Sequence, residues 1–333
     1  MKKLLLLGAG FSRNWGGWLA SEAFEYLLGC PEIMNNREVT NLLWKSKDSG
    51  GFEEVLAQVR MAWVRDSKGQ QANLDAIQAG IGRMFDAMNA GFFSLERFEF
   101  QQAQPRMVCH MLAQFDAIFT LNQDMLLEHH YMPEGAASFT GNRWSGGCTP
   151  PGVRPIANQA RASFSSFAKF DCVPDTSLFK IDGQTQPYIK LHGSSNWTEK
   201  HGAPLMIMGA NKVEDMKLFP LLLWYQEQFG RYLTEETESR LMVIGYGFRD
   251  AHINTTIFRA VRETGLKMFI IDPAGADIAW QINPTRKPGA IGATPSELEE
   301  VFQMAVVGAS RRPLSQIFGS DEVEHAKVVR FIA

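Results

Sequence analysis

Five short apolar runs, each followed by a glycine or a polar residue, constrain the fold more than any other feature of the sequence. They are KKLLLLG (2–8), FDAIFTLN (115–122), PYIKLHG (187–193), LMVIGYG (241–247) and MFIIDP (268–273), with a weaker sixth run, AKVVRFIA, at 326–333. Runs that are apolar on both faces are typical of parallel strands buried between helices. We therefore expect an α/β fold: a Rossmann-like open, mainly parallel sheet with helices on both faces. Ligands of such sheets gather at the carboxyl ends of the strands.

The unequal gaps between these runs predict how the chain is organised. The gap after the first run contains FEEVLAQVRMAWV and ANLDAIQAGIGRMFDAMNAGFF, whose apolar residues recur at spacings of three and four, as in helices. Residues 132–184 are rich in Gly, Ser, Pro and Asn, which favours an irregular, lid-like loop over the site. We expect a single domain (1–333), with a core at approximately 1–13, 105–131 and 185–333 and an inserted helical subdomain at 14–104.

A glycine loop, Gly8-Ala9-Gly10, follows the first run. Such a loop lets the backbone approach a pyrophosphate, although it can also be only a tight turn. The dehydrogenase fingerprint requires a third glycine where Arg13 stands, and a second strand that ends in an acid about 20 residues later. The segment SEAFEYLLGC reads instead as a helix. The sequence therefore disfavours hydride transfer.

Polar side chains or glycines also follow the other four runs. They are Asn122 and Asp124 after the second run, His192 after the third, Gly245, Gly247, Asp250 and Asn254 after the fourth, and Asp272 after the fifth. Taken singly, Asn122, Asp124 and Asp250 can be helix caps, and His192 can be a structural hydrogen-bonding residue. An acid placed like Asp272 often binds adenosine ribose hydroxyls. Five such termini at one sheet edge favour a common binding site.

Several other classes of protein are disfavoured. An export signal requires a longer apolar run than Leu4–Leu7, and no segment approaches the roughly 18 apolar residues of a membrane span. The four cysteines are widely spaced and the neighbouring His129 and His130 point apart on a helix, so we expect no metal and no disulfide framework. Reduced thiols favour a cytoplasmic protein. A net charge of −3 gives no indication of direct nucleic-acid binding.

The ordered motifs GAGFS, TLNQD, LHGSSNW, IGYGFRDAHIN and IIDP resemble the sirtuin-like (Sir2-type) NAD-binding domain. The resemblance is to the bacterial branch whose members hydrolyse NAD in defence against phage. Two features usual in the wider sirtuin family are absent: a G-I-P-D-F-R stretch after the first motif and a four-cysteine zinc module. Their absence argues against protein deacylation. The resemblance thus implies an NAD glycohydrolase that releases nicotinamide and ADP-ribose.

The resemblance also implies roles for the residues at the strand ends. Asn122 would position the attacking water or the nicotinamide ribose, His192 would act as a general base, and Asp124 would bind in the nicotinamide pocket or fix the loop. The other expected NAD contacts are Gly8, Ala9, Gly10, Ser12 and Arg13 near the diphosphate, Gly245, Gly247 and Asp272 near the adenosine, and Asn254. Phe11 is expected either to close over the ligand or to belong to the core. Nicotinamide leaves as a neutral molecule, so the paired carboxylates of ordinary glycosidases are unnecessary.

A toxic NAD hydrolase has to be held inactive until it is needed. By family analogy we expect a homo-oligomer and a regulatory partner, such as a ring-forming translocase-type ATPase or an Argonaute-type sensor. Two other functions stay open. One is an NAD-dependent protein deacylase or ADP-ribosyltransferase, and the other is a non-catalytic subunit that senses NAD or ADP-ribose.

Overall fold

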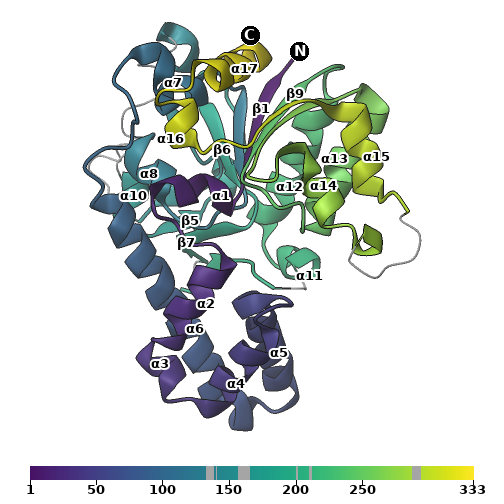
Figure 1. Ribbon diagram of the computed structural model, residues 1–333. Helices are drawn as coiled ribbons and strands as arrows, with labels where there is room; N and C mark the ends of the chain where they lie inside the picture. The colour runs from purple at the N-terminus through teal and green to yellow at the C-terminus, as the bar shows by residue number, and fades with distance from the viewer. Residues whose placement is uncertain (133–138, 140, 157–165, 200–201, 210–211, 287–293) are drawn as a thin grey trace.

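The computed structural model describes residues 1–132, 139, 141–156, 166–199, 202–209, 212–286 and 294–333. A seven-stranded sheet with the strand order β11-β10-β9-β1-β2-β6-β3 forms its centre (Figure 1). The strands are β1 (Lys3–Leu7), β2 (Ala117–Thr120), β3 (Cys148–Thr149), β6 (Gln186–Lys190), β9 (Arg240–Ile244), β10 (Lys267–Ile271) and β11 (Val306–Ser310). Every neighbouring pair is parallel. The predicted α/β, Rossmann-like fold is confirmed.

The central strand β1 shows why its sequence is apolar throughout. Leu5 and Leu7 belong to the hydrophobic core on one face of the sheet, and Leu4 and Leu6 belong to the core on the other. The helices that contribute to the first core include α7 (Val108–Ala113), α16 (Leu314–Ile317) and α17 (Glu322–Ile332), and those of the second include α12 (Pro220–Thr234), α13 (Ala251–Thr264) and α15 (Glu297–Ala305). A strand covered on both faces has no solvated side, so alternation with polar residues is lost.

The register of the sheet brings five strand ends to one level. Leu7 pairs with both Thr120 and Ile244, while Thr120 pairs with Lys190 and Ile244 pairs with Ile271. Parallel strands in register deliver their carboxyl ends to the same edge, so the loops after β1, β2, β6, β9 and β10 meet there.

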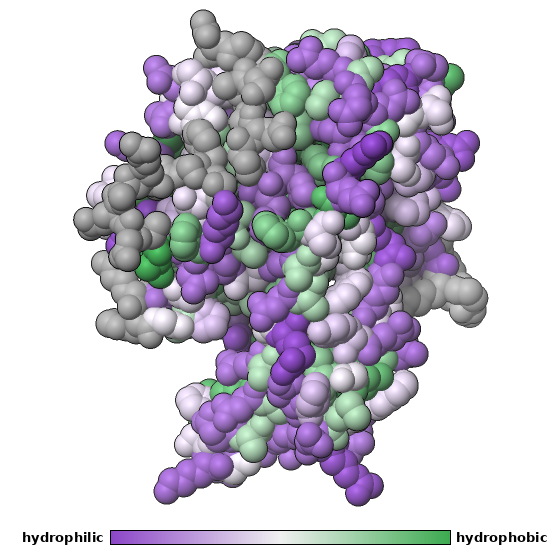
Figure 2. Space-filling view, turned by 90° about the vertical axis from the view of Figure 1, so that its left-hand side faces the viewer, coloured by the Kyte–Doolittle hydropathy of each residue, from purple (hydrophilic) through white to green (hydrophobic). Residues whose placement is uncertain are grey.

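The predicted helical insert projects from the sheet (Figure 1). It contains α2 (Ala20–Leu28), α3 (Pro31–Met34), α4 (Arg37–Ser46), α5 (Gly51–Arg65) and α6 (Ser67–Phe93). In the space-filling view this lobe extends from the main body, and its surface is largely hydrophilic with scattered apolar side chains (Figure 2). Asn89 near the end of α6 accepts a hydrogen bond from Met125 N (2.9 Å) and donates one to Ser195 Oγ (3.0 Å). The insert is therefore tied to the loop that follows β2 and to Ser195 of strand β7 (Gly193–Thr198).

The predicted sixth strand at 326–333 is wrong, because these residues belong to helix α17 and to its C-terminal end. Val328, Phe331 and Ile332 are buried at helical spacing, and the Asp321 side chain caps the helix by accepting from Glu324 N. Beyond β10 the sheet ends instead in β11, whose sequence VVGAS contains a glycine and is only partly buried. A short strand at the sheet edge carries little of the apolar signal that marks a central strand.

The stretch 132–184, expected to be an irregular lid, contains regular elements in its described part. They are η3 (Gly141–Trp144), β3, β4 (Val153–Pro155), α10 (Ser166–Lys169), β5 (Cys172–Pro174) and η4 (Thr176–Leu178). Strands β4 and β5 join β7 (Gly193–Thr198) and β8 (Pro204–Met206) in a second sheet with the order β4-β5-β7-β8. Residues 133–138, 140 and 157–165 of this stretch lie outside the described residues.

The remaining short elements connect these layers. They are α1 (Ala9–Ser12), η1 (Arg13–Trp15), η2 (Gln104–Arg106), α8 (Leu126–His130), α11 (Lys212–Met216), η5 (Gly275–Asp277), α14 (Ile278–Gln281) and η6 (Pro284–Arg286). Within the part of the chain that the structure describes, no helix combines the length and apolarity needed to span a membrane.

Candidate active site

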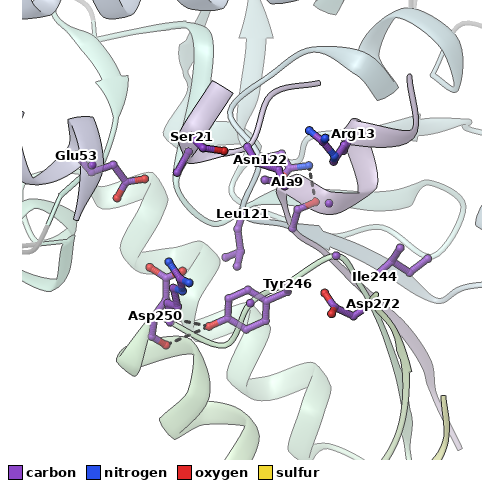
Figure 3. A pocket seen from close by; sticks show the side chains of 18 of the residues that line it. Ala9, Arg13, Ser21, Glu53, Leu121, Asn122, Ile244, Tyr246, Asp250 and Asp272 are labelled. Atoms are coloured by element: carbon purple, nitrogen blue, oxygen red, sulfur yellow. Dashed lines mark hydrogen bonds between the residues drawn. The ribbon is translucent and has the colours of Figure 1, made fainter. Parts of the chain in front are cut away.

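A cleft of about 1510 Å³ opens between the carboxyl edge of the sheet and the helical insert (Figure 3). Residues 47–54 of the insert and residues 311–315 after β11 form its outer walls. Nine of the expected site residues line it: Gly8, Ala9, Gly10, Arg13, Asn122, His192, Gly245, Gly247 and Asp272. The described residues of the predicted lid contribute nothing to this lining, so a lid over the site stays a prediction.

Four expected NAD contacts lie behind the cleft wall and are not among the residues that line it. Phe11 is buried and packs against Trp15, with ring centroids 5.0 Å apart. Asn254 donates to Phe248 O (2.8 Å) and so stabilises the loop after β9, where Phe248 has a positive φ of 51°. The other two, Ser12 and Asp124, hydrogen-bond to each other (2.8 Å). All four support the wall from within.

The glycine loops after β1 and β9 pack closely against each other, which explains why Gly10 and Gly245 lack side chains. Gly8 N donates to Ile244 O and Gly10 N donates to Gly245 O, each at 3.0 Å. A Cβ on Gly245 would lie 2.4 Å from the backbone of Gly10, and the φ of Gly245 is +64°. Gly247 differs, because a Cβ added there would have its nearest neighbour 4.0 Å away, on the Arg249 side chain. Gly245 is thus required by the packing of the loops, whereas Gly247 leaves open space beside the cleft.

This difference makes Gly245→Ala and Gly247→Ala a matched pair. Gly245→Ala is expected to lower the free energy of unfolding by about 2 kcal/mol or more, because both the left-handed backbone and the contact with Gly10 oppose a side chain. Gly247→Ala is expected to change it by only about 0.5 kcal/mol, as at an uncrowded site. Urea unfolding of both variants measures the effect. Equal stability of the two would contradict this account of the loop packing.

Hydrogen bonds fix the orientation of the Asn122 carboxamide. Its Nδ2 lies 3.0 Å from Gly8 O and 3.0 Å from Ser12 Oγ. A carbonyl oxygen only accepts, so the amide nitrogen has to face Gly8. Ser12 donates its own hydrogen to Asp124 Oδ2 and therefore accepts from Asn122. Both amide hydrogens are engaged in this way, which leaves Oδ1 of Asn122 as the acceptor available at the cleft.

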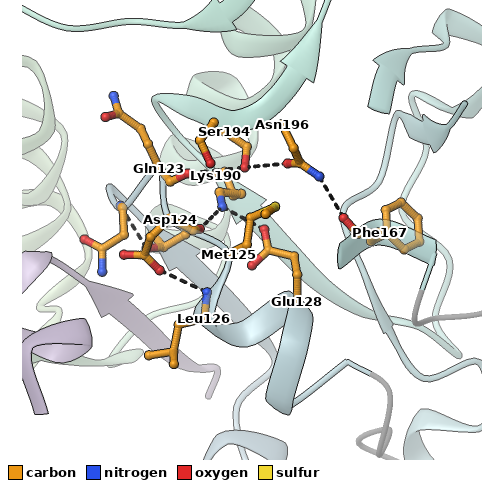
Figure 4. A network of polar contacts seen from close by, with 12 residues as sticks. Gln123, Asp124, Met125, Leu126, Glu128, Phe167, Lys190, Ser194 and Asn196 are labelled. Atoms are coloured by element: carbon orange, nitrogen blue, oxygen red, sulfur yellow. Dashed lines mark hydrogen bonds and ion pairs between the residues drawn. The ribbon is translucent and has the colours of Figure 1, made fainter. Parts of the chain in front are cut away.

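A buried polar network holds this arrangement from behind (Figure 4). Asp124 Oδ1 accepts from Leu126 N (3.1 Å), and the Lys190 ammonium donates to Asp124 O and to Glu128 Oε1 (2.7 Å). Lys190 and Glu128 are almost completely buried, at 0% and 2% exposure. Burial raises the pKa of Asp124, while the positive charge of Lys190 and the Ser12 hydrogen bond act in the opposite direction. The network makes Asp124 a support for the loop that carries Asn122.

His192 follows β6 and is buried at 3% exposure. Its Nε2 lies 3.3 Å from Nε2 of His252, the second residue of α13. Burial, followed by the positive charge of Lys212, lowers the pKa of His192 from 6.5 to about 3. Its imidazole is therefore neutral at physiological pH, as a general base has to be.

A model of the SIR2-like domain matches residues 116–287, from the start of β2 to η6. The chain belongs to the SIR2-like family. A comparison with curated proteins gives no match. Strand β1 and its glycine loop precede the matched region, but β1 lies between β2 and β9 and so completes the SIR2-like domain. Membership of this family implies a function related to NAD.

An ion-pair cluster in the SIR2-like domain was not predicted from the sequence. The Lys212 ammonium at the start of α11 bridges Glu53 of α5 (3.0 Å) and Asp250 (2.8 Å), and all three residues line the cleft. Asp250 occupies the N-cap position of α13, as expected, but its side chain pairs with Lys212 and makes no cap hydrogen bond. The cluster therefore joins the insert to the core beside His192.

The sequence marks His252 more clearly than it marks Lys212 and Glu53. His252 stands in the motif IGYGFRDAHIN, two residues after the predicted cap, so its position shortly after the fourth apolar run could have marked it as a candidate site residue. Lys212 and Glu53 follow no predicted strand, and their proximity to Asp250 depends on how the insert packs. Among the described residues, no group of three or more His, Cys, Asp or Glu side chains forms a metal-binding cluster.

The far end of the cleft in this SIR2-like domain carries Asp272 after β10. Its Oδ1 accepts from Ala274 N (2.8 Å), and burial raises its pKa. Arg311 and Arg312 line the same end, and Arg311 forms an ion pair with Asp277. The carboxylate can accept from hydroxyl groups, and the neighbouring arginines offer donors for a phosphate.

Proposed function

We propose that the chain is an NAD glycohydrolase that cleaves NAD to nicotinamide and ADP-ribose. The observation that carries this proposal is the locked Asn122 amide, whose Oδ1 is available in the same cleft as the neutral His192 imidazole. Cleavage of the cationic nicotinamide from ribose develops positive charge on the sugar, and a water molecule has to attack it. An amide oxygen and a neutral imidazole suit these two requirements.

The protein groups would act in a simple order. The glycine loop and the arginines at the cleft hold the diphosphate, and Asp272 accepts from ribose hydroxyls. Asn122 Oδ1 faces the developing positive charge or orients the attacking water, because its amide cannot rotate without losing the bonds to Gly8 and Ser12. His192 takes a proton from the water or from a ribose hydroxyl as the new bond forms.

Replacement of Asn122 by alanine is expected to lower kcat for nicotinamide release by about 10²- to 10³-fold, the range seen when a preorganised polar group is removed from a reacting centre. Calorimetric titration with NAD checks that binding is retained. Asn41→Ala, which removes an exposed amide on α4, serves as the control. Wild-type kcat in Asn122→Ala with an unchanged fold would contradict the assigned role.

A single chromatographic assay tests the proposed function. The purified full chain is incubated with NAD, with and without an acetylated peptide, and the products are separated. Equimolar nicotinamide and ADP-ribose without peptide is the expected result. O-acetyl-ADP-ribose formed only with peptide would indicate a deacylase, and the absence of any product in every assembly state would indicate an NAD or ADP-ribose sensor.

We further propose that the enzyme acts in the bacterial cytoplasm as the NAD-depleting effector of an anti-phage system. Regulation would come from homo-oligomerisation or from a partner such as a ring-forming translocase-type ATPase or an Argonaute-type sensor. These proposals are supported by the resemblance of the strand-end motifs to that branch. Light scattering coupled to size exclusion tests them, because a monomer with full activity in isolation would exclude control by assembly.

A further inference from the structure

A second histidine faces the expected general base. His252 belongs to the first turn of α13 and is half-buried at the cleft, whereas His192 follows β6. Their Nε2 atoms are 3.3 Å apart, and the ring planes are inclined by 43°. The two rings come from separate elements of the core, so the contact depends on the tertiary fold.

The contact determines the protonation pattern of the two neutral rings. One Nε2 has to donate and the other has to accept, because a neutral imidazole carries a hydrogen on only one nitrogen. Among the described residues, neither Nδ1 has a hydrogen-bond partner. When Nε2 of His192 is the donor to His252, its Nδ1 carries a lone pair and is available for a substrate or water proton.

The surroundings of the pair favour movement of a proton from His192 towards His252. Burial and Lys212 lower the pKa of His192 strongly, to about 3. Burial also lowers the pKa of His252, which is only half-buried, and for both rings the charge of Asp250 raises the pKa while that of Lys212 lowers it. Glu53 forms an ion pair with Lys212, which also pairs with Asp250. An extra proton is therefore more stable on His252 than on His192.

We propose that His252 is a proton-relay residue that acts through His192 during NAD hydrolysis. This inference rests on the proposed function. The attacking water loses a proton to Nδ1 of His192 as its oxygen bonds to the ribose carbon and the bond to nicotinamide breaks. At the same time the hydrogen on Nε2 of His192 moves to Nε2 of His252. His192 ends neutral, and His252 becomes an imidazolium beside Asp250 that returns its proton to solvent through the cleft.

His252→Gln and His252→Ala test the relay. Both variants are expected to lower kcat for nicotinamide release by at least about 10-fold, with a smaller effect on KM. Both rings have to be neutral for the relay to work. The pKa of His252, the more basic ring, therefore determines the pH at which wild-type activity is lost on acidification. In His252→Gln the loss of activity on acidification is expected at a lower pH than in the wild-type protein. Added imidazole is expected to restore part of the activity of His252→Ala. A purely structural His252 would leave the pH profile unchanged.

Nitrogen NMR of the histidine rings gives a readout that does not depend on turnover. In the wild-type protein, Nε2 of His192 is expected to carry the hydrogen and Nε2 of His252 to accept it, and His252→Gln is expected to shift the His192 signals. His325→Gln, which changes a histidine on α17 that is absent from the cleft lining, is the control. Unchanged His192 signals, or wild-type kcat and pH profile in His252→Gln, would overturn the relay. Absence of nicotinamide release by the wild-type protein would contradict the proposed function instead.

Discussion

Replacement of His192 by alanine is expected to slow nicotinamide release by about 10²- to 10⁴-fold, the range of a lost general base. The physical reason is that a proton has to leave the attacking water, and the buried, neutral imidazole is the base that we assign in the cleft that Asn122 also lines. Single-turnover release of nicotinamide measures the chemical step, and titration with NAD shows whether binding persists. His325→Gln again controls for the loss of a histidine away from the cleft. Full release in a folded His192→Ala protein would remove His192 from the mechanism.

The pH dependence of the wild-type enzyme follows from the same environment. Burial and Lys212 lower the pKa of His192 from 6.5 to about 3, and burial lowers that of His252, so both rings stay neutral where an exposed imidazole would become charged. We expect kcat/KM to stay level as the pH falls through 6.5. Lys212→Met removes a positive charge that lowers the pKa of both His192 and His252, so it should raise both pKa values and move the loss of activity to higher pH. A loss centred at 6.5 in the wild-type enzyme would contradict this.

Replacement of Lys190 by methionine is expected to lower the free energy of unfolding by about 3–5 kcal/mol, as when one partner of a buried ion pair is removed. The variant leaves the carboxylate of Glu128 buried without its cation and deprives Asp124 O of a donor. Denaturant unfolding, followed by fluorescence and by circular dichroism, measures the change.

A double variant separates the cost of the unpaired charge from loss of packing. In Lys190→Met/Glu128→Gln neither partner of the ion pair is charged, and the glutamine can still accept from the Tyr188 hydroxyl, which lies 3.3 Å from Glu128 in the wild-type protein. We expect this protein to be more stable than Lys190→Met alone. Lys217→Met, which breaks an exposed pair with Glu214, is the control and should have little effect. An equal loss of unfolding free energy in Lys190→Met and Lys217→Met would show that the buried pair stabilises the fold no more than the exposed pair does.

The fold could be predicted from the sequence because its central strands are covered on both faces. Leu4–Leu7 and the other four runs have no polar alternation, and their buried neighbours in the sheet explain why. Strand β11 was not predicted because it lies at the edge of the sheet and is partly exposed. Helix α17 was predicted as a strand because its β-branched residues Val328 and Val329 are adjacent in the sequence. Local pattern therefore predicts the middle of this sheet better than its margin.

The site was predictable to the extent that strand ends define it. Asn122, His192 and Asp272 reach one cleft because parallel strands in register end together. Sequence could not tell that Ser12 and Asp124 support the wall from behind, nor that Lys212 meets Asp250, because those contacts depend on side-chain packing between distant segments. The catalytic roles of these residues stay predictions until the variants are measured.

The position of β1 in the sheet has a consequence for synthesis of the protein. Strand β1 is made before both of its neighbours, β2 and β9, and its glycine loop is completed by Gly245. Asp272 follows later still. A nascent chain that has not yet reached β10 therefore lacks one wall of the cleft, and the N-terminal segment has to wait for partners made much later. Under the proposed function, the cleft that would bind NAD is thus incomplete until β10 and Asp272 have been made.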